Sequence, residues 1–335
     1  MNLSARRLLL SWEALLVAII VVVVAVGGMF APHFLTAPNL SDAASNLSEK
    51  ALMLLPMIAL IIAREIDLSV ASTAGLASVV VGFTFTAGMP LPVGIALAVA
   101  VGALCGLLNG LLVAGFGLPS LVVTLATLGL YRGLYYVILE GNSVAGFPEW
   151  FTDFGFGYIP GTLIPQPTVV VVIAIAAFAV WLHASRGGRT VYAFGNGPGA
   201  ARYSALPVRS TLMGLFVVSG VMSALAGVVY SARFASARAD AAFGFELDVV
   251  AAALLGGVSI LGGRGAILGG VLGLALLGLV RNALTLLGIS SEVQSVVVGT
   301  LLVVAVSITT AVGVRPERAR RETPPGRRKG AQIES

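Results

Sequence analysis

The sequence predicts an all-α polytopic membrane protein with about ten transmembrane helices. Of its 335 residues, 58% are hydrophobic and only 10% are charged, and the mean hydropathy is +0.99. A soluble domain has about 25% charged residues, so this chain could not cover a water-exposed surface. Apolar runs of about 20 residues recur along its length, and each is long enough to cross a hydrocarbon core as a helix. The continuous run from Trp12 to Ala31 contradicts the short alternating segments of a β-barrel.

The order of the apolar runs predicts which loops share a side of the membrane. The loop 185–209 carries four arginines and no acid, both termini are rich in arginine, and the loop 140–166 carries three acids and no base. Because basic loops favour the cytoplasm, both termini and the loop 185–209 are expected there, as an even number of spans requires. The ten expected spans are 12–31, 45–63, 67–87, 92–114, 119–139, 167–184, 210–230, 247–262, 266–285 and 292–312.

The ends of the chain differ from its apolar body. Arg6 and Arg7 precede the first span as in a signal peptide, but the apolar run is too long and lacks a clear cleavage site, so we expect it to be retained. The tail 315–335 is basic and is expected to be disordered. It could bind anionic membrane lipid at about 1 kcal/mol per basic residue. Much of the net charge of +5 lies in this tail and in one loop, which argues against a nucleic-acid partner.

Two related acidic strings interrupt the apolar sequence, EIDLSVA at 65–71 and FELDVVA at 245–251. At similar intervals after them come Asn109 and a helix break in the first half, and Asn282 and another break in the second half. The repeated unit would contain five spans. Because an odd number of spans must reverse direction, the pattern predicts two inverted five-helix repeats, an arrangement that frames the substrate path in several transporters.

The acids in these strings admit two interpretations. Asp67 and Asp248 could cap the helices that follow them, where the helix dipole is positive and backbone N–H groups lack partners, while Arg64 closes the preceding helix. Alternatively, both carboxylates lie deeper and line a cavity between the repeats, although a carboxylate at mid-bilayer costs about 2.5–3.5 kcal/mol. The sequence leaves their depth open.

The basic loop 185–209 contains a predicted short helix. GNGPG at 195–199 predicts a turn, in which Pro198 favours a helix start and Asn196 is a possible cap. The helix would cover 199–206 and end before Pro207. A short helix beneath a membrane bundle is a site on which a partner protein can push. Alternatively, residues 185–209 form only a solvated loop between two spans.

From about residue 38 to residue 308, the chain resembles the permease subunits of ATP-binding-cassette sugar importers of the ribose, xylose and arabinose type. The order and spacing of several segments match over most of the chain; they are EIDLSVAS, LLNGLLVAGFGLPSLVVTLATLGLYRGL, GRTVYAFGNGPGAARYSAL, FELDVVAAALLGGVSILGGRGAILGG and NALTLLGISS. Within this group, the permeases of rhamnose importers are the most similar, through the strings SWEALL, PNLSDAASNLSEKA and IIAREIDLSVA.

The resemblance implies a permease domain over residues 1–314, in the bacterial plasma membrane. Such a permease pairs with a second copy or a paralogue, receives sugar from an extracytoplasmic binding protein, and is driven by separate cytoplasmic ATPase subunits. It also implies that part of the loop 185–209 is the coupling helix that docks on the ATPase. The residues that would couple are Gly195, Asn196, Ala200, Ala201, Arg202 and Ser204.

The chain departs from the family pattern at two places. Arg64 and Glu65 stand where many relatives have two glycines, which supports the rhamnose-like subgroup but leaves other sugars, or a sugar-like signalling molecule, open. Ala205 replaces a glycine that usually follows the coupling serine, so the end of the short helix is also open.

The sequence shows no motif for ATP hydrolysis and no spacing of residues that would bind a metal ion. A phosphate loop needs a lysine before Ser or Thr, and neither Lys50 nor Lys329 lies in that context. We therefore expect no catalytic residue and no cofactor on this chain, with ATP and Mg²⁺ bound by the partner ATPase. His33 and His183 are far apart and outside any metal-binding spacing, so no metal site is expected, and Cys105 lies alone in an apolar run.

The path of the solute is expected among polar residues of the spans, because a neutral sugar is desolvated through hydrogen bonds and aromatic faces. For each candidate, hydrogen bonding between helices is the alternative role. Arg132 has no assigned partner. An ion-driven transporter that works alone is the competing function, and it predicts ionisable groups deep in the bundle. The path candidates are Asp67, Ser69, Asn109, Thr124, Asp248, Asn282 and Gln294.

Overall fold

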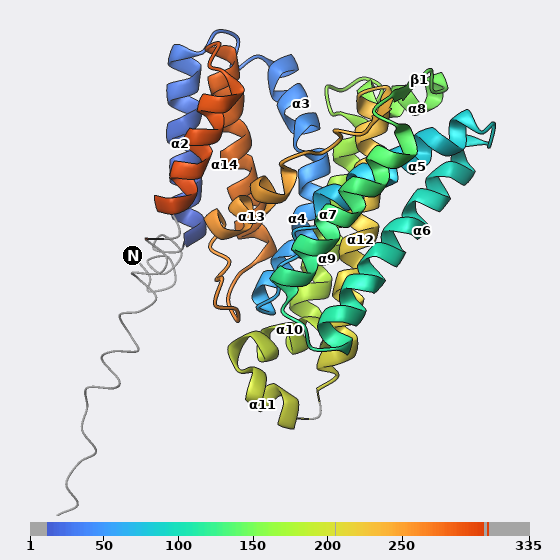
Figure 1. Ribbon diagram of the computed structural model, residues 1–335. Helices are drawn as coiled ribbons and strands as arrows, with labels where there is room; N and C mark the ends of the chain where they lie inside the picture. Colours follow the sequence, from blue (N-terminus) through green and yellow to red (C-terminus); the bar gives the residue numbers. More distant parts are fainter. Residues whose placement is uncertain (1–11, 205, 305–306, 308–335) are drawn as a thin grey trace, which may run out of the picture.

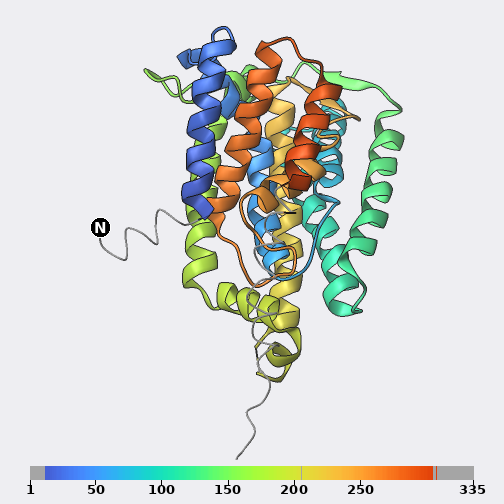
Figure 2. The ribbon, with the colours of Figure 1, turned by 90° about the vertical axis from the view of Figure 1, so that its left-hand side faces the viewer.

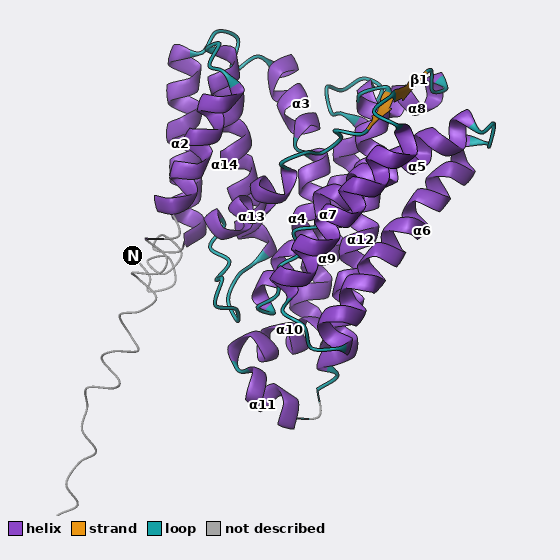
Figure 3. Cartoon of the chain, viewed as in Figure 1, coloured by secondary structure: helices purple, strands orange, loops and turns teal. Residues whose placement is uncertain are grey.

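The computed structural model describes residues 12–204, 206–304 and 307, so Arg6, Arg7 and the tail 315–335 lie outside the described residues. The chain is an all-α polytopic membrane protein in which two short strands accompany the helices (Figures 1 and 3). The elements are α2 (Trp12–Phe30), α3 (Ala37–Asn46), α4 (Ser48–Ile62), α5 (Val70–Thr86), α6 (Leu91–Gly110), the π-helical turn η1 (Leu111–Gly115), α7 (Ser120–Leu139), β1 (Ser143–Ala145), α8 (Glu149–Phe156), α9 (Gln166–Ala184), α10 (Arg186–Asn196), α11 (Pro198–Tyr203), α12 (Val208–Arg233), β2 (Ser236–Arg238), α13 (Phe245–Leu255), α14 (Ile267–Leu286) and an apolar helix over Ser291–Val304.

Helices stand at all ten expected spans, but they differ in length. In the described part of the chain, α2, α6 with η1, α7, α9, α12 and α14 are each long and apolar enough to cross a membrane, and α3 and α4 qualify together although they are bent by 46°. The helix α5 is shorter. The helix Ser291–Val304 stands at the expected span 292–312, of which residues 305, 306 and 308–312 lie outside the described residues. The helix α13 has 11 residues, so most of a bilayer span is missing from the predicted segment 247–262.

The central helix of the bundle is α4. All but one of its 15 residues are buried, and the exception is Lys50, which is half-buried. It packs against α12, α13, α9 and α14. Pro56 lies inside α4, where neighbouring helices can compensate for the missing backbone hydrogen bond. The chain thus encloses a continuous apolar helix whose two ends carry charged residues.

Glycines allow the backbones of neighbouring helices to approach each other closely. A Cβ atom on Gly106 of α6 would lie 2.2 Å from the carbonyl oxygen of Phe216 in α12. Likewise, a Cβ atom on Gly273 of α14 would lie 2.2 Å from the carbonyl oxygen of Ala252 in α13. In both pairs, backbone packs on backbone, as small residues permit in membrane bundles.

The two long loops lie at opposite ends of the bundle. The loop 185–209 forms α10 and α11, which extend below the bundle in Figures 1 and 2, and the strands and α8 lie at the other end. There β1 pairs antiparallel with β2, with Val144 opposite Ala237. The string 65–71 follows the end of α4 that contacts α10, whereas Asp248 of the string 245–251 binds Lys50 near the start of α4. The two strings therefore lie at opposite ends of α4, and the inversion of the two halves stays a prediction.

Candidate functional site

The helix α4 ends in a turn that gives Arg64 an uncommon backbone conformation. The N–H of Arg64 donates to the carbonyl of Ile61 and that of Glu65 to the carbonyl of Leu60, both at 2.9 Å, which is the Schellman pattern of a helix end. This pattern requires a left-handed residue, and Arg64 has φ 65° where α13 uses Gly257 with φ 82°. Arg64 therefore closes α4 as predicted, at a conformational cost of about 1–2 kcal/mol.

The side chain of Arg64 ties α4 to the connector, the name used here for residues 185–209. Its Nε donates to the carbonyl oxygen of Gly195 in α10 at 2.8 Å. A Cβ atom on Gly195 would lie 1.9 Å from the carbonyl oxygen of Ile62, so only glycine fits at this contact. The end of α10 and the end of α4 are in direct backbone contact.

A third segment, the loop 256–266 between α13 and α14, completes this contact. The N–H of Gly263 donates to the carbonyl of Ile62 at 2.8 Å, and the hydroxyl of Tyr192 donates to the carbonyl of Gly265 at 2.7 Å. The amide nitrogen of Asn196 donates to the carbonyl of Gly263 at 3.3 Å. We call these bonded residues the connector junction, and they are Ile62, Arg64, Tyr192, Gly195, Asn196, Gly263 and Gly265.

The connector consists of two helices where one short helix was predicted. The helix α10 runs to Asn196, whose side chain donates to the carbonyl of Tyr192 at 2.9 Å and does not cap the next helix. The short helix expected over 199–206 is α11, which begins one residue earlier at Pro198 and ends earlier than expected, at Tyr203. Gly197 alone separates the two helices.

The predicted coupling residues divide between these helices. Gly195 and Asn196 end α10 inside the junction, whereas Ala200, Ala201 and Arg202 belong to α11 and Ser204 follows it. Ala201 is buried, and Tyr203 is 95% exposed at the tip. The side chain of Arg202 lies outside the described residues.

A buried polar cluster surrounds Asp67. Its Oδ1 accepts hydrogen bonds from the backbone N–H of Ser69 at 3.0 Å and from the Ser69 hydroxyl at 2.6 Å. Its Oδ2 accepts from the hydroxyl of Ser219 in α12 at 2.7 Å, and the Ser69 oxygen accepts from the amide of Asn109 in α6 at 2.8 Å. All four residues are at most 2% exposed. This Asp67 cluster joins α5, α6 and α12 through hydroxyl and amide groups.

Neither Asp67 nor Asp248 caps a helix, so that interpretation was wrong. Ser69 is the N-cap of α5, and Asp67 accepts the N–H two residues further on, as in an Asx turn. Gly244 is the N-cap of α13, and Asp248 lies within its first turn. Both carboxylates are buried, and each is enclosed by bonded partners.

The carboxylate of Asp248 is held by two bases. Its Oδ2 lies 2.7 Å from the Lys50 ammonium of α4, and its Oδ1 lies 2.5 Å from the Arg281 guanidinium of α14. Next to Arg281, the side chain of Asn282 exchanges two hydrogen bonds with Asn39, at 2.9 and 3.0 Å. We call Lys50, Asp248 and Arg281 the Asp248 cluster, which joins α4, α13 and α14.

Two further ion pairs flank this cluster. Arg233 at the end of α12 contacts Glu49 at 2.7 Å, and Arg132 of α7 contacts Glu246 at 3.3 Å. Arg132 also stacks over the ring of Phe243 at 4.4 Å, so it has the partner that the sequence did not reveal. These acids bind bases and do not gather together. In the described part of the chain, no three His, Cys, Asp or Glu side chains form a group that could hold a metal ion.

The remaining path candidates lie near one cluster or the other. Thr124 donates to the carbonyls of Ile66 and Ser120, beside the first acidic string. Gln294 donates to the hydroxyl of Thr285 at 3.1 Å and ties the helix Ser291–Val304 to α14. Asp67, Ser69, Asn109 and Thr124 therefore belong to one region, and Asp248 and Asn282 to another.

The basic residues that pair with the buried acids could not be assigned to them from the sequence. Lys50, Arg233 and Arg281 stand within or next to apolar runs, and a base there needs an acid partner because an unpaired buried charge is costly. That rule flags the bases but does not select their partners. Ser219 was one of several polar residues on the spans, and nothing in its local sequence points to Asp67.

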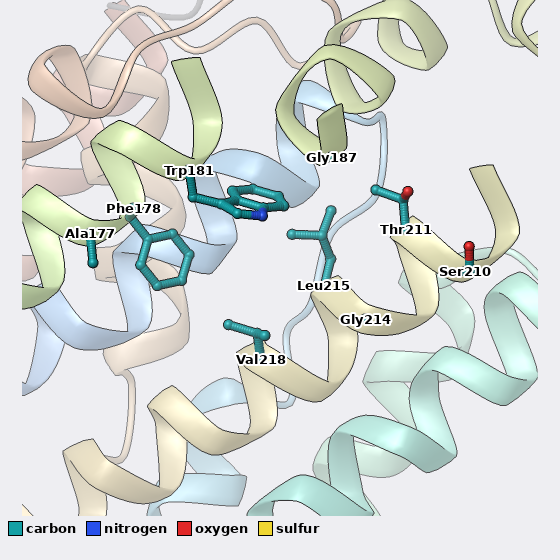
Figure 4. Close-up of a pocket in the computed structure, with 9 residues that line it drawn as sticks. All are labelled: Ala177, Phe178, Trp181, Gly187, Ser210, Thr211, Gly214, Leu215 and Val218. Carbon is teal, nitrogen blue, oxygen red and sulfur yellow. The ribbon is translucent and has the colours of Figure 1, made fainter. Parts of the chain in front are cut away.

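An apolar cavity of about 480 Å³ lies beside the connector (Figure 4). Phe178 and Trp181 of α9 face Leu215 and Val218 of α12 across it, and Gly187 of α10 stands at one edge. Such walls suit a hydrocarbon chain better than a polyhydroxylated solute, whose hydroxyl groups would lose their hydrogen bonds to water. We therefore assign no sugar to this cavity.

Comparison with known proteins gives a consistent set of relatives. Residues 39–306 match a family described as the permease component of branched-chain amino acid transport systems. The autoinducer 2 import system permease protein LsrD of Escherichia coli K12, of Escherichia coli O157:H7 and of Shigella flexneri is in each case 35% identical over 307 residues. Each alignment covers 90% of this chain and 92% of the relative. No solved structure matches.

Proposed function

The chain belongs to this family of transport-system permease components, and we propose that it is the membrane-spanning subunit of an ATP-driven importer for a sugar-type solute. It would be a multi-pass protein of the bacterial inner membrane, with its permease domain in residues 1–314. The single observation that carries the mechanism is the connector junction. It bonds α10, which precedes α11 and its exposed Tyr203, to the end of α4 and to the loop between α13 and α14.

The junction is placed to transmit movement from the connector to the bundle. At one side, Arg64, which lies three residues before Asp67, donates a hydrogen bond to the carbonyl of Gly195 at 2.8 Å. At the other side, Tyr192 and Asn196 bond to the loop 256–266, which connects α13 with α14. A push on α11 would be transmitted through α10 to the segment that positions Asp67 and to the helices that carry Asp248. The two halves of the bundle would then move together.

The driving subunit would be a separate ATPase that docks on α11 and binds ATP and Mg²⁺. Docking would involve Gly195, Asn196, Ala200, Ala201, Arg202 and Ser204, and the exposed Tyr203 offers a further contact. An extracytoplasmic binding protein would deliver the solute at the opposite end, near β1 and α8. A second permease copy or a paralogue would complete the membrane part, with the connector and both termini in the cytoplasm.

The solute would be a small polyhydroxylated molecule. We expect a sugar-like signalling molecule, because the relatives at 35% identity are named for autoinducer 2 import. Rhamnose is the competing prediction, from the strings near the N-terminus and around Arg64. Binding assays on the partner binding protein separate the two solutes, since an importer of this kind selects its cargo chiefly there.

Reconstitution tests the transport function. Vesicles that contain this chain, its ATPase and its binding protein should accumulate the solute only when ATP and Mg²⁺ are present on the ATPase side. An ion-driven transporter is the alternative, and buried acids such as Glu49 and Asp248 give it some support, although each is paired with a base. Uptake by the chain alone under a proton or sodium gradient would overturn the proposal.

Two variants test the docking surface. Arg202→Glu and Tyr203→Ala should leave membrane insertion unchanged but abolish co-purification of the ATPase and ATP-driven uptake, because both residues lie on α11. Arg186→Glu, at the exposed start of α10, is the matched control and should keep both activities. Normal transport by Arg202→Glu and Tyr203→Ala would contradict the docking assignment.

A further inference from the structure

A polar pocket of about 410 Å³ lies at the end of the molecule opposite to the connector. It is formed where α3, the end of α8, the start of α9 and the end of α12 meet, and its volume is in the range of small-molecule sites. Its polar lining residues are Asp42, Ser45, Asn46, Tyr158 and Arg233. Neither the path candidates nor the coupling residues belong to it.

The side chains of this pocket match the chemistry of a neutral polyol. Asp42 supplies carboxylate oxygens that accept hydrogen bonds, one of them from the Tyr158 hydroxyl at 3.3 Å, and Asn46 offers both donors and an acceptor. Aromatic rings stand beside them, with Tyr158 39% exposed and Phe234 47% exposed. A sugar ring needs such a combination of hydrogen-bonding groups for its hydroxyls and an apolar face for its C–H side.

The shape of the pocket is fixed by close packing. A Cβ atom on Gly155 would lie 2.3 Å from the carbonyl carbon of Ala232, so the end of α8 lies directly on the end of α12. The ring of Phe234 stacks on that of Tyr230, with centroids 4.4 Å apart. Arg233 stacks over Phe234 at 4.9 Å. Aromatic and basic groups at the rim are therefore held in place before any ligand arrives.

The pocket is connected to the ion pairs of the central helix. The guanidinium of Arg233 donates to Asn46 Oδ1 at 2.5 Å and to Glu49 Oε1 at 2.7 Å. Glu49 precedes Lys50, which binds Asp248 at 2.7 Å. A ligand that displaces Asn46 from Arg233 would therefore act on the bonds that fasten α4 to α12 and α13.

We propose that this pocket is a low-affinity entry site for a neutral sugar-type solute, used between its release from the binding protein and its passage through the bundle. The inference rests on the proposed function, because only an importer presents its solute at this end. The polar side chains would hold the hydroxyl groups, and Phe234 would cover the apolar face of the ring.

Saturation-transfer NMR on the full-length chain in lipid nanodiscs tests the site directly, since it detects weak binding. The probes are L-rhamnose and autoinducer 2, with leucine, a zwitterion that has an apolar side chain and no hydroxyl group, as a control solute of similar size. Wild-type protein should transfer saturation to at least one of the first two probes and not to leucine. Phe234→Ala and Asn46→Ala should weaken the apparent affinity about two- to tenfold, the range expected for loss of one aromatic contact.

Matched controls separate the pocket from general surface effects. Phe116→Ala removes a more exposed aromatic ring from the connector end, and Asp153→Asn changes an exposed acid on α8; both should bind as wild type does. Phe234→Tyr keeps the ring and should retain binding, and a Tm of Phe234→Ala equal to wild type excludes misfolding as the cause of any loss. Absence of saturation transfer to rhamnose and autoinducer 2, or equal effects of Phe116→Ala and Phe234→Ala, would overturn the entry site. ATP-driven uptake would then still stand, so the two proposals fail separately.

Discussion

The Asp67 and Asp248 clusters occupy related positions in the two halves of the chain, yet they are built from different chemistry. Asp67 accepts hydrogen bonds from Ser69 and Ser219 at 2.6 to 3.0 Å, and none of the ion pairs among the described residues includes it. Asp248 instead lies within 2.7 Å of both Lys50 and Arg281. Similar sequence strings therefore do not imply similar interactions.

Because the two clusters differ in chemistry, we expect the helices around Asp67 to move against one another more easily than the helices around Asp248. Hydroxyl groups can rotate to donate or accept, so the Asp67 cluster can rearrange at little cost when α5 moves against α6 and α12. Ion pairs in a buried site are costly to break one partner at a time, so the Asp248 cluster resists separation of α4, α13 and α14. The connector junction bonds to Arg64, three residues before Asp67, and to the loop 256–266 between α13 and α14, so it would drive a compliant half against a stiff one.

The largest effect is expected from Asp248→Asn. This change leaves Lys50 and Arg281 without their acid in a largely buried site, where removal of one partner of an ion pair costs about 3–5 kcal/mol. Thermal unfolding of the purified chain in lipid nanodiscs should show a large fall in Tm. The double variant Lys50→Met with Asp248→Leu should recover part of the loss, and a Tm equal to wild type in the single variant would remove the proposed stiffness of this cluster.

The next largest effect is expected at the junction. Gly195→Ala places a methyl group 1.9 Å from the carbonyl oxygen of Ile62, so the backbone must shift, at a cost of about 1–3 kcal/mol. Coupling should fail as well, so that ATPase activity in the reconstituted importer no longer rises with solute. Gly129→Ala on α7, which meets no atom within 4 Å and lies outside the connector, is the matched control and should leave both properties unchanged. Equal behaviour of the two variants would show that the close contact is dispensable.

Asp67→Asn should have a smaller effect than Asp248→Asn, which tests the comparison itself. Asparagine keeps one acceptor oxygen, and a rotated serine hydroxyl can accept from its amide, so the loss should stay within about 0.5–1.5 kcal/mol, the value of one hydrogen bond. The same thermal assay measures it, with Ser219→Ala as a second probe of the cluster. If Asp67→Asn destabilised the chain as much as Asp248→Asn, the two clusters would not differ as proposed.

The smallest effect is expected at the exposed pair of Arg238, the last residue of β2, and Asp240, which lies outside the spans. Hydrogen bonds from Arg238 lower the pKa of the Asp240 carboxyl below its usual value. Because the folded-state pKa is depressed, the stabilisation is present above the unfolded pKa of about 3.9 and is lost as pH falls through the folded value. Asp240→Asn should lower Tm slightly at pH 7 and not at pH 2. A fall as large as that of Gly195→Ala would contradict the ranking.

Much of the fold follows from the sequence because apolar runs of membrane length leave few alternatives. The exceptions have local causes that a hydropathy pattern does not contain. The segment 247–262 becomes the short helix α13 because Gly257, Gly262 and Gly263 adopt positive φ angles of 82°, 78° and 75°. The predicted span 45–63 is bent by 46° between Asn46 and Ser48. The first break depends on the conformation of single glycines, and the second lies in the polar segment 45–50 at the start of the expected span.

The candidate site was less accessible to prediction. Coupling residues could be carried over from the resemblance, and the acidic strings drew attention to Asp67 and Asp248. Their partners are remote in the chain, however, since Ser219 is 152 residues from Asp67 and Lys50 is 198 residues from Asp248. A single sequence contains no signal that pairs such positions. The tertiary fold alone brings them together.

Accessibility of the connector tests the central claim most directly, because an ATPase can drive the bundle only if α11 faces the cytoplasm. Gly199→Cys places a thiol where no atom of the fold lies within 4 Å, while the native Cys105 is buried. A membrane-impermeant maleimide should label this variant in inside-out vesicles and leave it unlabelled in right-side-out vesicles. Labelling from the outer face only would contradict the account.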